Sequence, residues 1–255
     1  MSLISKDIAE TLAGQLDTLK SQFSENQPFP HIILDDFFPK SVIDSVRDDF
    51  PSEDDESLWE VNRMEGIEVK MRSNWQSEYD MPEKIREMVH FLNSGLFLRH
   101  LAEMTGIPKL ISDPYYTGGG LNCSLPGGHL DVHVDGNYHD AMGVHRRLNL
   151  LVYLNKEWDE SWGGDLSFYD ETGDVEVARI APKYNRVVIF ETHDKTFHGH
   201  PEPLKCPEGE SRKSLILYYY TSEKRPSDQI TVERPHSALW RSKNWKDKRG
   251  NVERS

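Results

Sequence analysis

The sequence predicts a mainly β protein, a sandwich or jelly roll, with helices buttressing one face of the sheet. In the first third of the 255-residue chain, apolar residues recur every three or four positions, as in amphipathic helices. From Ile111 onward, short runs rich in Val, Ile, Leu, Tyr and Phe alternate with Gly, Pro and Asp. Such runs are typical of closed or double-layered antiparallel sheets. Helices followed by strands, without alternation, argue against a doubly wound parallel fold.

The N-terminal part is expected to contain two helices and a short strand. The first helix covers about residues 5–24, and its apolar stripe consists of Ile8, Leu12, Leu16, Leu19 and Phe23. Two prolines then interrupt the chain, and the run 31–34 is expected to be extended. Pro39 suits the first turn of a second helix, whose apolar positions are Val42, Ile43, Val46 and Phe50.

Two further helices and a series of strands are expected after a loop. Residues 52–57 are polar and acidic, which is typical of a loop. Asp80 and Pro82 are expected to begin a third helix, and Ser94 to cap a fourth that runs to about Met104. The predicted strands cover about residues 148–154, 165–169, 175–180, 186–190 and 215–221.

These elements are expected to form one structural domain in three parts. Residues 1–110 form an N-terminal helical buttress, residues 111–222 form the β part, and residues 223–255 form a basic C-terminal extension. The extension contains Trp240 and Trp245, and from residue 222 onward the chain holds 9 basic and 5 acidic residues. We expect it to pair with the acidic N-terminal region or to stay solvated, with docking of an acidic partner as the alternative.

Composition excludes several classes of protein. The net charge of −13 argues against nucleic-acid binding. The longest apolar run has six residues, 215–220, so no membrane span is expected, and no apolar stretch near Met1 resembles a signal peptide. Two cysteines, Cys123 and Cys206, form neither a disulfide framework nor a CxxC metal motif. We therefore expect a cytoplasmic protein.

Histidines carry the clearest chemical signal. They gather in two regions, and the participating residues are His129, His133, His139, His145, His193, His198 and His200. In a strand, a His-x-Asp pattern places an imidazole and a carboxylate on one face. A further histidine from another strand completes the two-histidine, one-carboxylate set that suits non-haem Fe(II) and leaves positions open.

Several segments surround these histidines in a fixed order. They are PGGHLDVHVD (126–135), RLNLLVYLN (147–155), WGGDL (162–166), FHGHPEP (197–203) and RKSL (212–215). Taken together, they resemble the Fe(II)/2-oxoglutarate-dependent oxygenase superfamily, specifically its prolyl-4-hydroxylase-like branch. The resemblance covers about residues 110–222 and implies a double-stranded β-helix, a jelly-roll or cupin-like barrel, for that part of the chain.

The resemblance also implies roles for individual residues. His133, Asp135 and His198 would bind Fe(II), while Arg212, helped by Ser214, would bind the distal carboxylate of 2-oxoglutarate. The planar guanidinium suits a buried dicarboxylate. Oxygen is the co-substrate and ascorbate an accessory reductant. Ser124 stands where relatives of the collagen hydroxylases often have tyrosine, so Asn122 or Asn149 is expected to supply the polar contact.

Two alternatives for the ligands come from the same segments. His129 and Asp131 form a second His-x-Asp pattern, and His200 shares a strand face with His198. We favour His133 and Asp135 because the resemblance implies ligands about six residues after the glycine that corresponds to Gly127, and His198 because of the Gly and Pro-x-Pro that follow it. In this interpretation the alternative residues lie in the pocket or outside it.

The expected function is a 2-oxoglutarate-dependent hydroxylase. It would act on an unactivated C–H of a small molecule, an amino acid or a prolyl residue, with release of succinate and CO2, alone or as a homodimer. Desaturation, epimerisation and ring formation are alternative outcomes of the same chemistry. The rival from another class is a non-catalytic jelly-roll module that binds metal or carbohydrate. Arg212 discriminates between them, because a bare metal-binding barrel does not need it.

Overall fold

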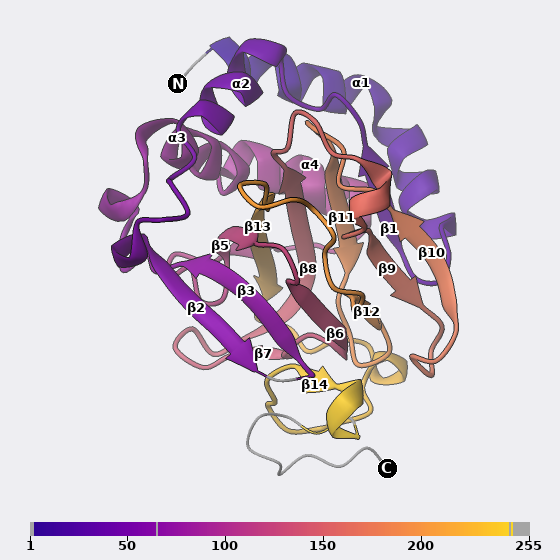
Figure 1. Cartoon of the computed structure of the whole chain (residues 1–255). Coiled ribbons are helices and arrows are strands. Elements are labelled where there is room, and N and C mark those ends of the chain that lie inside the picture. Colours follow the sequence, from indigo (N-terminus) through magenta and orange to yellow (C-terminus); the bar gives the residue numbers. More distant parts are fainter. Residues whose placement is uncertain (1–2, 65, 245, 247–255) are drawn as a thin grey trace.

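The computed structural model describes residues 3–64, 66–244 and 246. Its four α-helices, counted over these residues, gather on one side of a curled β-sheet (Figure 1). They are α1 (Leu3–Glu25), α2 (Lys40–Asp48), α3 (Glu83–Leu92) and α4 (Gly95–Thr105). The predicted mainly β fold with N-terminal helices on one face is therefore confirmed.

The strands form one sheet in which every described pairing is antiparallel. Its main path runs β1-β11-β8-β13-β5-β3-β6-β12-β9-β10. Those strands are β1 (His31–Leu34), β3 (Glu68–Ser73), β5 (Gly120–Ser124), β6 (His129–Val134), β8 (Val144–Tyr153), β9 (Leu166–Tyr169), β10 (Glu176–Ile180), β11 (Val187–Glu191), β12 (His198–His200) and β13 (Arg212–Thr221). Beside this path lie β2 (Trp59–Met64), β4 (Ile111–Ser112), β7 (Tyr138–His139) and β14 (Leu239–Trp240).

Successive side chains of β8 belong alternately to two different hydrophobic cores. Leu148, Leu150 and Val152 belong to a core shared with the helices. Leu151 and Tyr153 belong to a second core inside the curl. Successive residues of a strand point to opposite faces, so this single strand divides the helix layer from the interior of the sheet. The interior is where the candidate site lies.

Two expectations about residues before 111 were wrong. The hairpin of β2 and β3 was not predicted, although β3 pairs with both β5 and β6 and joins the N-terminal part to the sheet. Asp80 does not cap α3. Its carboxylate accepts instead from the backbone N–H groups of Gln76 and Ser77 at 2.8 and 2.9 Å, within the short helix before α3.

The predicted cap of α4 is present, whereas the C-terminal extension pairs differently from the expectation. Ser94 caps α4 as predicted, accepting from the N–H of Phe97 at 3.3 Å. Arg225 and Arg241 of the extension pair with acidic residues of the β part, not with the acidic N-terminal region. The expectation that the extension pairs with the N-terminal region or stays solvated was therefore wrong for these two residues. Trp245 lies outside the described residues.

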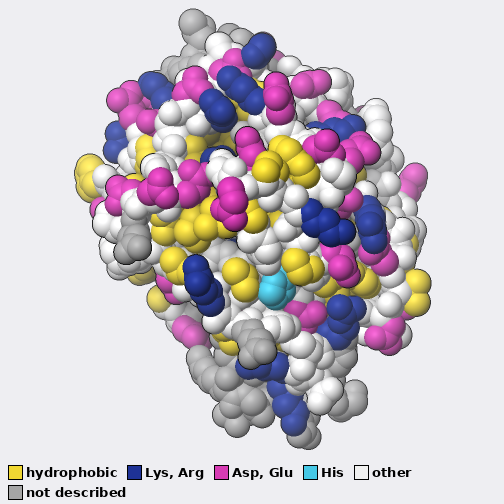
Figure 2. All heavy atoms as spheres, in the orientation of Figure 1, with side chains coloured by type: hydrophobic (Ala, Val, Ile, Leu, Met, Phe, Trp, Pro, Cys, Tyr) yellow, Lys and Arg dark blue, Asp and Glu magenta, His cyan; other side chains and the backbone are white. Residues whose placement is uncertain are grey.

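The surface carries charges of both signs. On the face shown in Figure 2, Asp and Glu side chains are interspersed with Lys and Arg. None of the described helices is long and apolar enough to cross a membrane.

Candidate active site

A cavity of about 470 Å³ lies inside the curl of the sheet. Its walls come from β2, β3, β5, β6, β8, β9, β11, β12 and β13, and from chain that follows β13. Apolar side chains form one part of the wall, namely Leu151, Leu166, Phe190 and Ile216. Polar side chains converge on the remainder, which is the usual composition of a small-molecule site.

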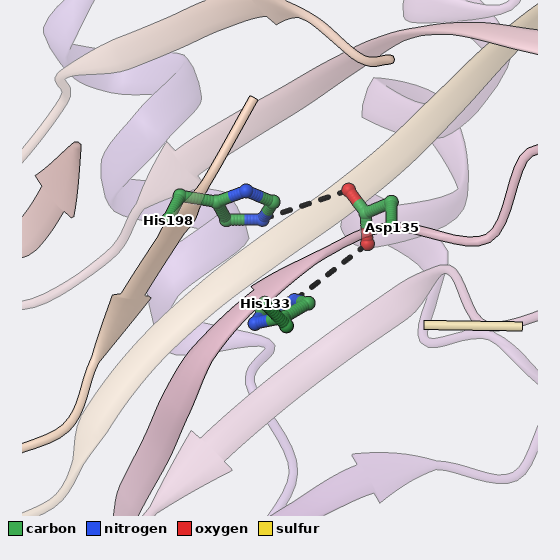
Figure 3. A group of neighbouring side chains, drawn as sticks. All are labelled: His133, Asp135 and His198. Atoms are coloured by element: carbon green, nitrogen blue, oxygen red, sulfur yellow. Dashed lines mark ion pairs between the residues drawn. The ribbon is translucent and has the colours of Figure 1, made fainter. Parts of the chain in front are cut away.

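His133, Asp135 and His198 meet in this cavity. His133 and His198 are direct partners across the antiparallel pair β6–β12, and Asp135 follows the last residue of β6. The Nε2 atoms of His133 and His198 lie 3.7 and 3.5 Å from the two Asp135 oxygens (Figure 3). Among the described residues, this is the group of His, Cys, Asp and Glu side chains able to hold a metal ion.

Both imidazoles present the correct nitrogen for a metal. Nδ1 of His133 lies 2.8 Å from the backbone oxygen of Asp131, and Nδ1 of His198 lies 3.0 Å from that of Thr196. A carbonyl oxygen only accepts, so each Nδ1 carries the proton and each Nε2 keeps its lone pair. Burial, together with the charge of His133, lowers the pKa of His198 to about 4, which keeps its ring neutral at pH 7.

Asp135 is held as a carboxylate by its neighbours. Burial opposes its ionisation, but attraction to His198, His133 and Arg146 outweighs that effect and keeps the pKa of Asp135 below its usual range. Arg146 Nη1 lies 3.4 Å from Oδ1, and Asn149 Nδ2 donates to Oδ2 at 2.6 Å. The three side chains thus provide two imidazoles, whose Nε2 atoms face one carboxylate, and this is the set that suits Fe(II).

Arg212 places an unbalanced positive charge on the same cavity. It begins β13 and is only 5% exposed. Its Nε donates to the Gly164 backbone oxygen at 2.7 Å, and Nη2 donates to the Tyr153 hydroxyl at 3.2 Å. Both acceptors are neutral, and no carboxylate of the described residues forms an ion pair with this guanidinium. A buried cation without a counter-ion is costly, so the cavity is suited to an anionic ligand.

The other predicted polar residues lie around Arg212 and Asp135. Asn122 lines the cavity and donates to the Gly120 oxygen at 3.2 Å. Asn149 lines it too, but its Nδ2 donates a hydrogen bond to Asp135, so this residue supports a candidate metal ligand. Ser214 is fully buried on the same face of β13 as Arg212 and Ile216, without itself lining the cavity.

The structure also separates the alternative ligands from the chosen ones. Asp131 accepts from the backbone N–H of Ser242 at 2.8 Å, away from the group formed by the three ligands. Nδ1 of His129 lies beside its own chain, 3.3 Å from the Gly127 oxygen. His200 lines the cavity, but a register shift after His198 places it opposite Leu130, whereas regular pairing would place it opposite Asp131.

Three residues of the site were not foreseen. Tyr153 contacts Arg212, Trp240 stacks on His133, and Arg146 contacts Asp135. The sequence did not predict Arg146, because the pairing of β8 with β13 shifts its register between Leu148 and Arg146. A strict alternation would give Arg146 and Asn149 opposite faces, yet both line the cavity. Tyr153 alone carried a signal, because it shares a strand face with Asn149.

The central segment of the chain is similar to a known family. Residues 119–220 match the 2OG-Fe(II) oxygenase superfamily. Prolyl 3-hydroxylase OGFOD1 of Mus musculus is 33% identical over 86 residues, which are 32% of this chain and 15% of that protein. The chain therefore spans only a small part of the curated relative that it matches. The expected resemblance to this superfamily is confirmed.

Solved structures confirm the predicted architecture. A prolyl hydroxylase from Trichoplax adhaerens, in complex with a peptide of the hypoxia inducible factor oxygen degradation domain, superposes with a TM-score of 0.59. It is 15% identical, and the match covers 84% of this chain and 91% of that one. A prolyl-4-hydroxylase from Pseudomonas putida gives a TM-score of 0.57 at 18% identity, covering 84% and 100%. At these identities the likeness concerns the fold, the double-stranded β-helix.

Proposed function

We propose that this chain, whose residues 119–220 match the 2OG-Fe(II) oxygenase superfamily, is an Fe(II)- and 2-oxoglutarate-dependent dioxygenase that hydroxylates an unactivated C–H bond. One observation supports this proposal above all. A single cavity is lined both by the three side chains suited to Fe(II) and by a buried arginine without a counter-ion. A site for metal alone would account for the first feature but not for the second.

Each residue then has a defined task. His133, Asp135 and His198 would hold Fe(II), and Asn149 and Arg146 fix the carboxylate of Asp135. Bound Fe(II), 2-oxoglutarate and O2 supply the oxidising chemistry, in which one oxygen atom converts 2-oxoglutarate to succinate and CO2 and the other enters the C–H bond. The protein binds and orients the reactants and excludes bulk water.

Arg212 would bind the distal carboxylate of 2-oxoglutarate. Its Nε and one Nη2 proton are engaged by Gly164 and Tyr153, which fix the plane of the guanidinium while leaving further N–H groups for an anion. Asn122 and Ser214 are direct partners across the paired strands β5 and β13, two residues along from the pair formed by Ser124 and Arg212. We assign the remaining polar contact with the cosubstrate to Asn122, because Asn122 lines the cavity and Ser214 does not.

We propose an amino-acid side chain as the substrate, with a prolyl residue as the first to test. The curated relative is named a prolyl 3-hydroxylase, and the cavity has an apolar wall suited to an aliphatic C–H. Free amino acids, other small molecules and prolyl peptides form the screening panel. Formation of succinate that depends on one member of the panel identifies its class, and mass analysis of the product separates hydroxylation from desaturation.

The cofactor pair is tested by anaerobic titration of the apo-protein with Fe(II) and 2-oxoglutarate. The wild type should develop a weak visible charge-transfer band. His133→Ala should abolish the band, whereas His129→Ala should retain it, because His129 lies outside the group of three ligands. A band that survives in His133→Ala but disappears in His129→Ala would assign the metal to the other His-x-Asp pair.

Arg212→Ala tests the cosubstrate site in the same titration. This variant should need far more 2-oxoglutarate for the same band, because a charge-assisted pair is lost. Arg179→Ala is the matched control, since Arg179 is exposed on β10 and, among the described residues, its ion-pair partner is Glu176. Absence of any band in the wild type, together with no Fe(II) binding, would overturn the proposed enzyme and favour a non-catalytic jelly-roll module.

A further inference from the structure

The chain beyond β13 is fixed to the barrel beside the candidate metal ligands. We call residues 225–244 the C-terminal segment. Its first anchor is the buried carboxylate of Asp194, on the loop before β12. Arg225 Nη1 and His236 Nε2 lie 2.9 and 3.2 Å from Asp194 Oδ1. The N–H groups of Thr231 and Val232 donate to Oδ2 at 2.8 and 2.9 Å.

Further anchors lie on and just after the ligand-bearing strand β6. Asn137 accepts from the His236 N–H at 2.8 Å and donates to the Arg234 oxygen at 3.1 Å. Asp131 accepts from the Ser242 N–H at 2.8 Å. Between these points the segment passes so close to Gly136 that a Cβ there would meet the His236 oxygen at 3.0 Å. The C-terminal segment therefore covers the residue that follows Asp135.

The anchors bring an indole against a candidate metal ligand. Within β14, Leu239 and Trp240 pair with Val134 and His133 of β6. The indole of Trp240, which is 2% exposed, stacks on the His133 imidazole with ring centroids 4.6 Å apart and an interplanar angle of 27°. The His198 ring also contacts that imidazole, at 4.4 Å and 49°.

From this geometry we infer that Trp240 is a positioning residue for His133, and that the C-terminal segment is a working part of the metal site. The inference rests on the proposed function. The Nδ1 contact with the Asp131 oxygen fixes one point of the imidazole but leaves the ring able to tilt about it. The stacked indole restricts that tilt, so Nε2 stays directed at the metal position. Groups that orient a ligand commonly change metal affinity by about 10–100-fold when they are removed.

The test is Co(II) binding to the full chain, measured by calorimetry and by the visible d–d spectrum without 2-oxoglutarate. Trp240→Leu should bind Co(II) about 10-fold or more weakly and show an altered spectrum. Trp240→Phe keeps an aromatic ring on His133 and should stay close to the wild type in both. Trp59→Leu is the matched control, because Trp59 is a similarly buried indole that packs on Phe50 in the helix-side core.

Fluorescence gives a second readout that does not depend on activity. Co(II) should quench the emission of Trp240 in the wild type because the indole lies against a metal ligand, and Trp240→Phe should lose that component of the quenching. Circular dichroism and thermal melting of each apo-variant separate loss of folding from loss of metal binding. If Trp240→Leu does not fold, the fluorescence quenching and the Co(II) affinity of the folded Trp240→Phe variant decide whether Trp240 positions His133.

The outcomes separate the inference from the proposed function. Wild-type Co(II) affinity and spectrum in folded Trp240→Leu would overturn the positioning role while leaving the enzyme proposal intact. Equal weakening in Trp240→Phe and Trp240→Leu would exclude aromatic stacking as the cause and also overturn it. Failure of the wild type to bind Co(II) would overturn both the inference and the proposed function.

Discussion

Asn149 shows that a residue lining the cavity can act on a neighbouring ligand instead of on a bound reactant. Its Nδ2 donates to Asp135 Oδ2 at 2.6 Å, so the amide holds one carboxylate oxygen while Arg146 approaches the other. Asn122 lines the same cavity but does not contact Asp135. Two asparagines that were assigned one role from the sequence thus have different neighbours and are expected to differ in function.

Asn149→Ala should weaken metal binding, by about 10-fold or more, because Asp135 loses the donor that orients it. Asn122→Ala should leave the metal affinity at the wild-type value and weaken only the binding of 2-oxoglutarate. Calorimetric titrations with Co(II), and with 2-oxoglutarate added to the Co(II) protein, measure the two affinities. Equal metal affinities in the two variants would contradict the expected difference in role between Asn149 and Asn122.

His193 links protonation to stability outside the group of ligands. Its Nδ1 accepts from the Lys195 N–H at 3.2 Å, which requires a neutral ring. Burial and the nearby charge of Arg225 lower the pKa of His193 to about 4, against 6.5 for an ordinary histidine. The folded state therefore excludes a proton that the unfolded state takes up. The resulting stability is complete above about pH 6.5 and is lost as the pH falls toward 4.

Between pH 7 and pH 5 the free energy of unfolding of the apo-protein should decrease by up to about 2 kcal/mol more in the wild type than in His193→Asn. Asparagine can accept the same bond without titrating. Urea unfolding at the two pH values measures the difference. An identical decrease in both proteins would show that His193 does not contribute to the pH dependence.

At the scale of elements, how well the sequence predicted structure depended on how strongly an element is buried. The stripes of α1 and the apolar runs of β8 and β13 were predictable because one face of each packs in a core. The hairpin of β2 and β3 was missed because β2 is largely exposed and mixes charged with apolar residues. Its pairing with the rest of the sheet, through β3, gives no periodic signal in the sequence.

The candidate site, like the fold, was predicted from the sequence only in part. The three candidate ligands and Arg212 stand in segments that resemble a known family, so the sequence pointed to all four, and the structure places them around one cavity. Arg146 was not predictable because a register shift in β8 changes the face on which it lies. Trp240 was not predictable because its contact with His133 joins residues 107 positions apart through a short strand.

The turn before β9 offers a prediction at the same scale. Gly164 has a φ of +78°, and a Cβ there would meet Arg212 Cδ at 3.0 Å and Leu204 Cδ2 at 2.7 Å. Gly164→Ala should therefore displace Arg212 and weaken 2-oxoglutarate binding at least several-fold, with metal binding unchanged. Gly163→Ala is the control for backbone strain, because Gly163 has a φ of +73° but a Cβ there would meet none of the described atoms within 4 Å. Calorimetry with 2-oxoglutarate compares them, and equal effects would assign the loss to strain alone.

At the scale of the whole molecule, the candidate ligands couple metal binding to folding. His198 comes from β12 and the other two ligands from β6 and the residue after it, so the three side chains meet only in the folded sheet. A ligand that binds only the folded state stabilises it, and the stabilisation rises with the logarithm of the free ligand concentration above the dissociation constant. The metal should therefore act as a stabiliser of the entire domain.

Co(II) at about 100 times its dissociation constant should add about 2.7 kcal/mol to the free energy of unfolding. For a chain of this size, that corresponds to a rise in Tm of about 5–10 °C. Differential scanning calorimetry with and without Co(II) measures the rise. His133→Ala should show little of it, and a similar rise in that variant would place the bound metal elsewhere.

The position of β6 in the sheet has a consequence for the order in which the protein is made. One side of β6 pairs with β12, while the other side is shared end to end by β3, which precedes it in the chain, and β14, which follows it by about a hundred residues. A ribosome that has completed the ligands has therefore not yet made the strand that lies against His133. Until Trp240 has left the exit tunnel, a nascent chain can hold all three ligands and still lack part of the wall around them.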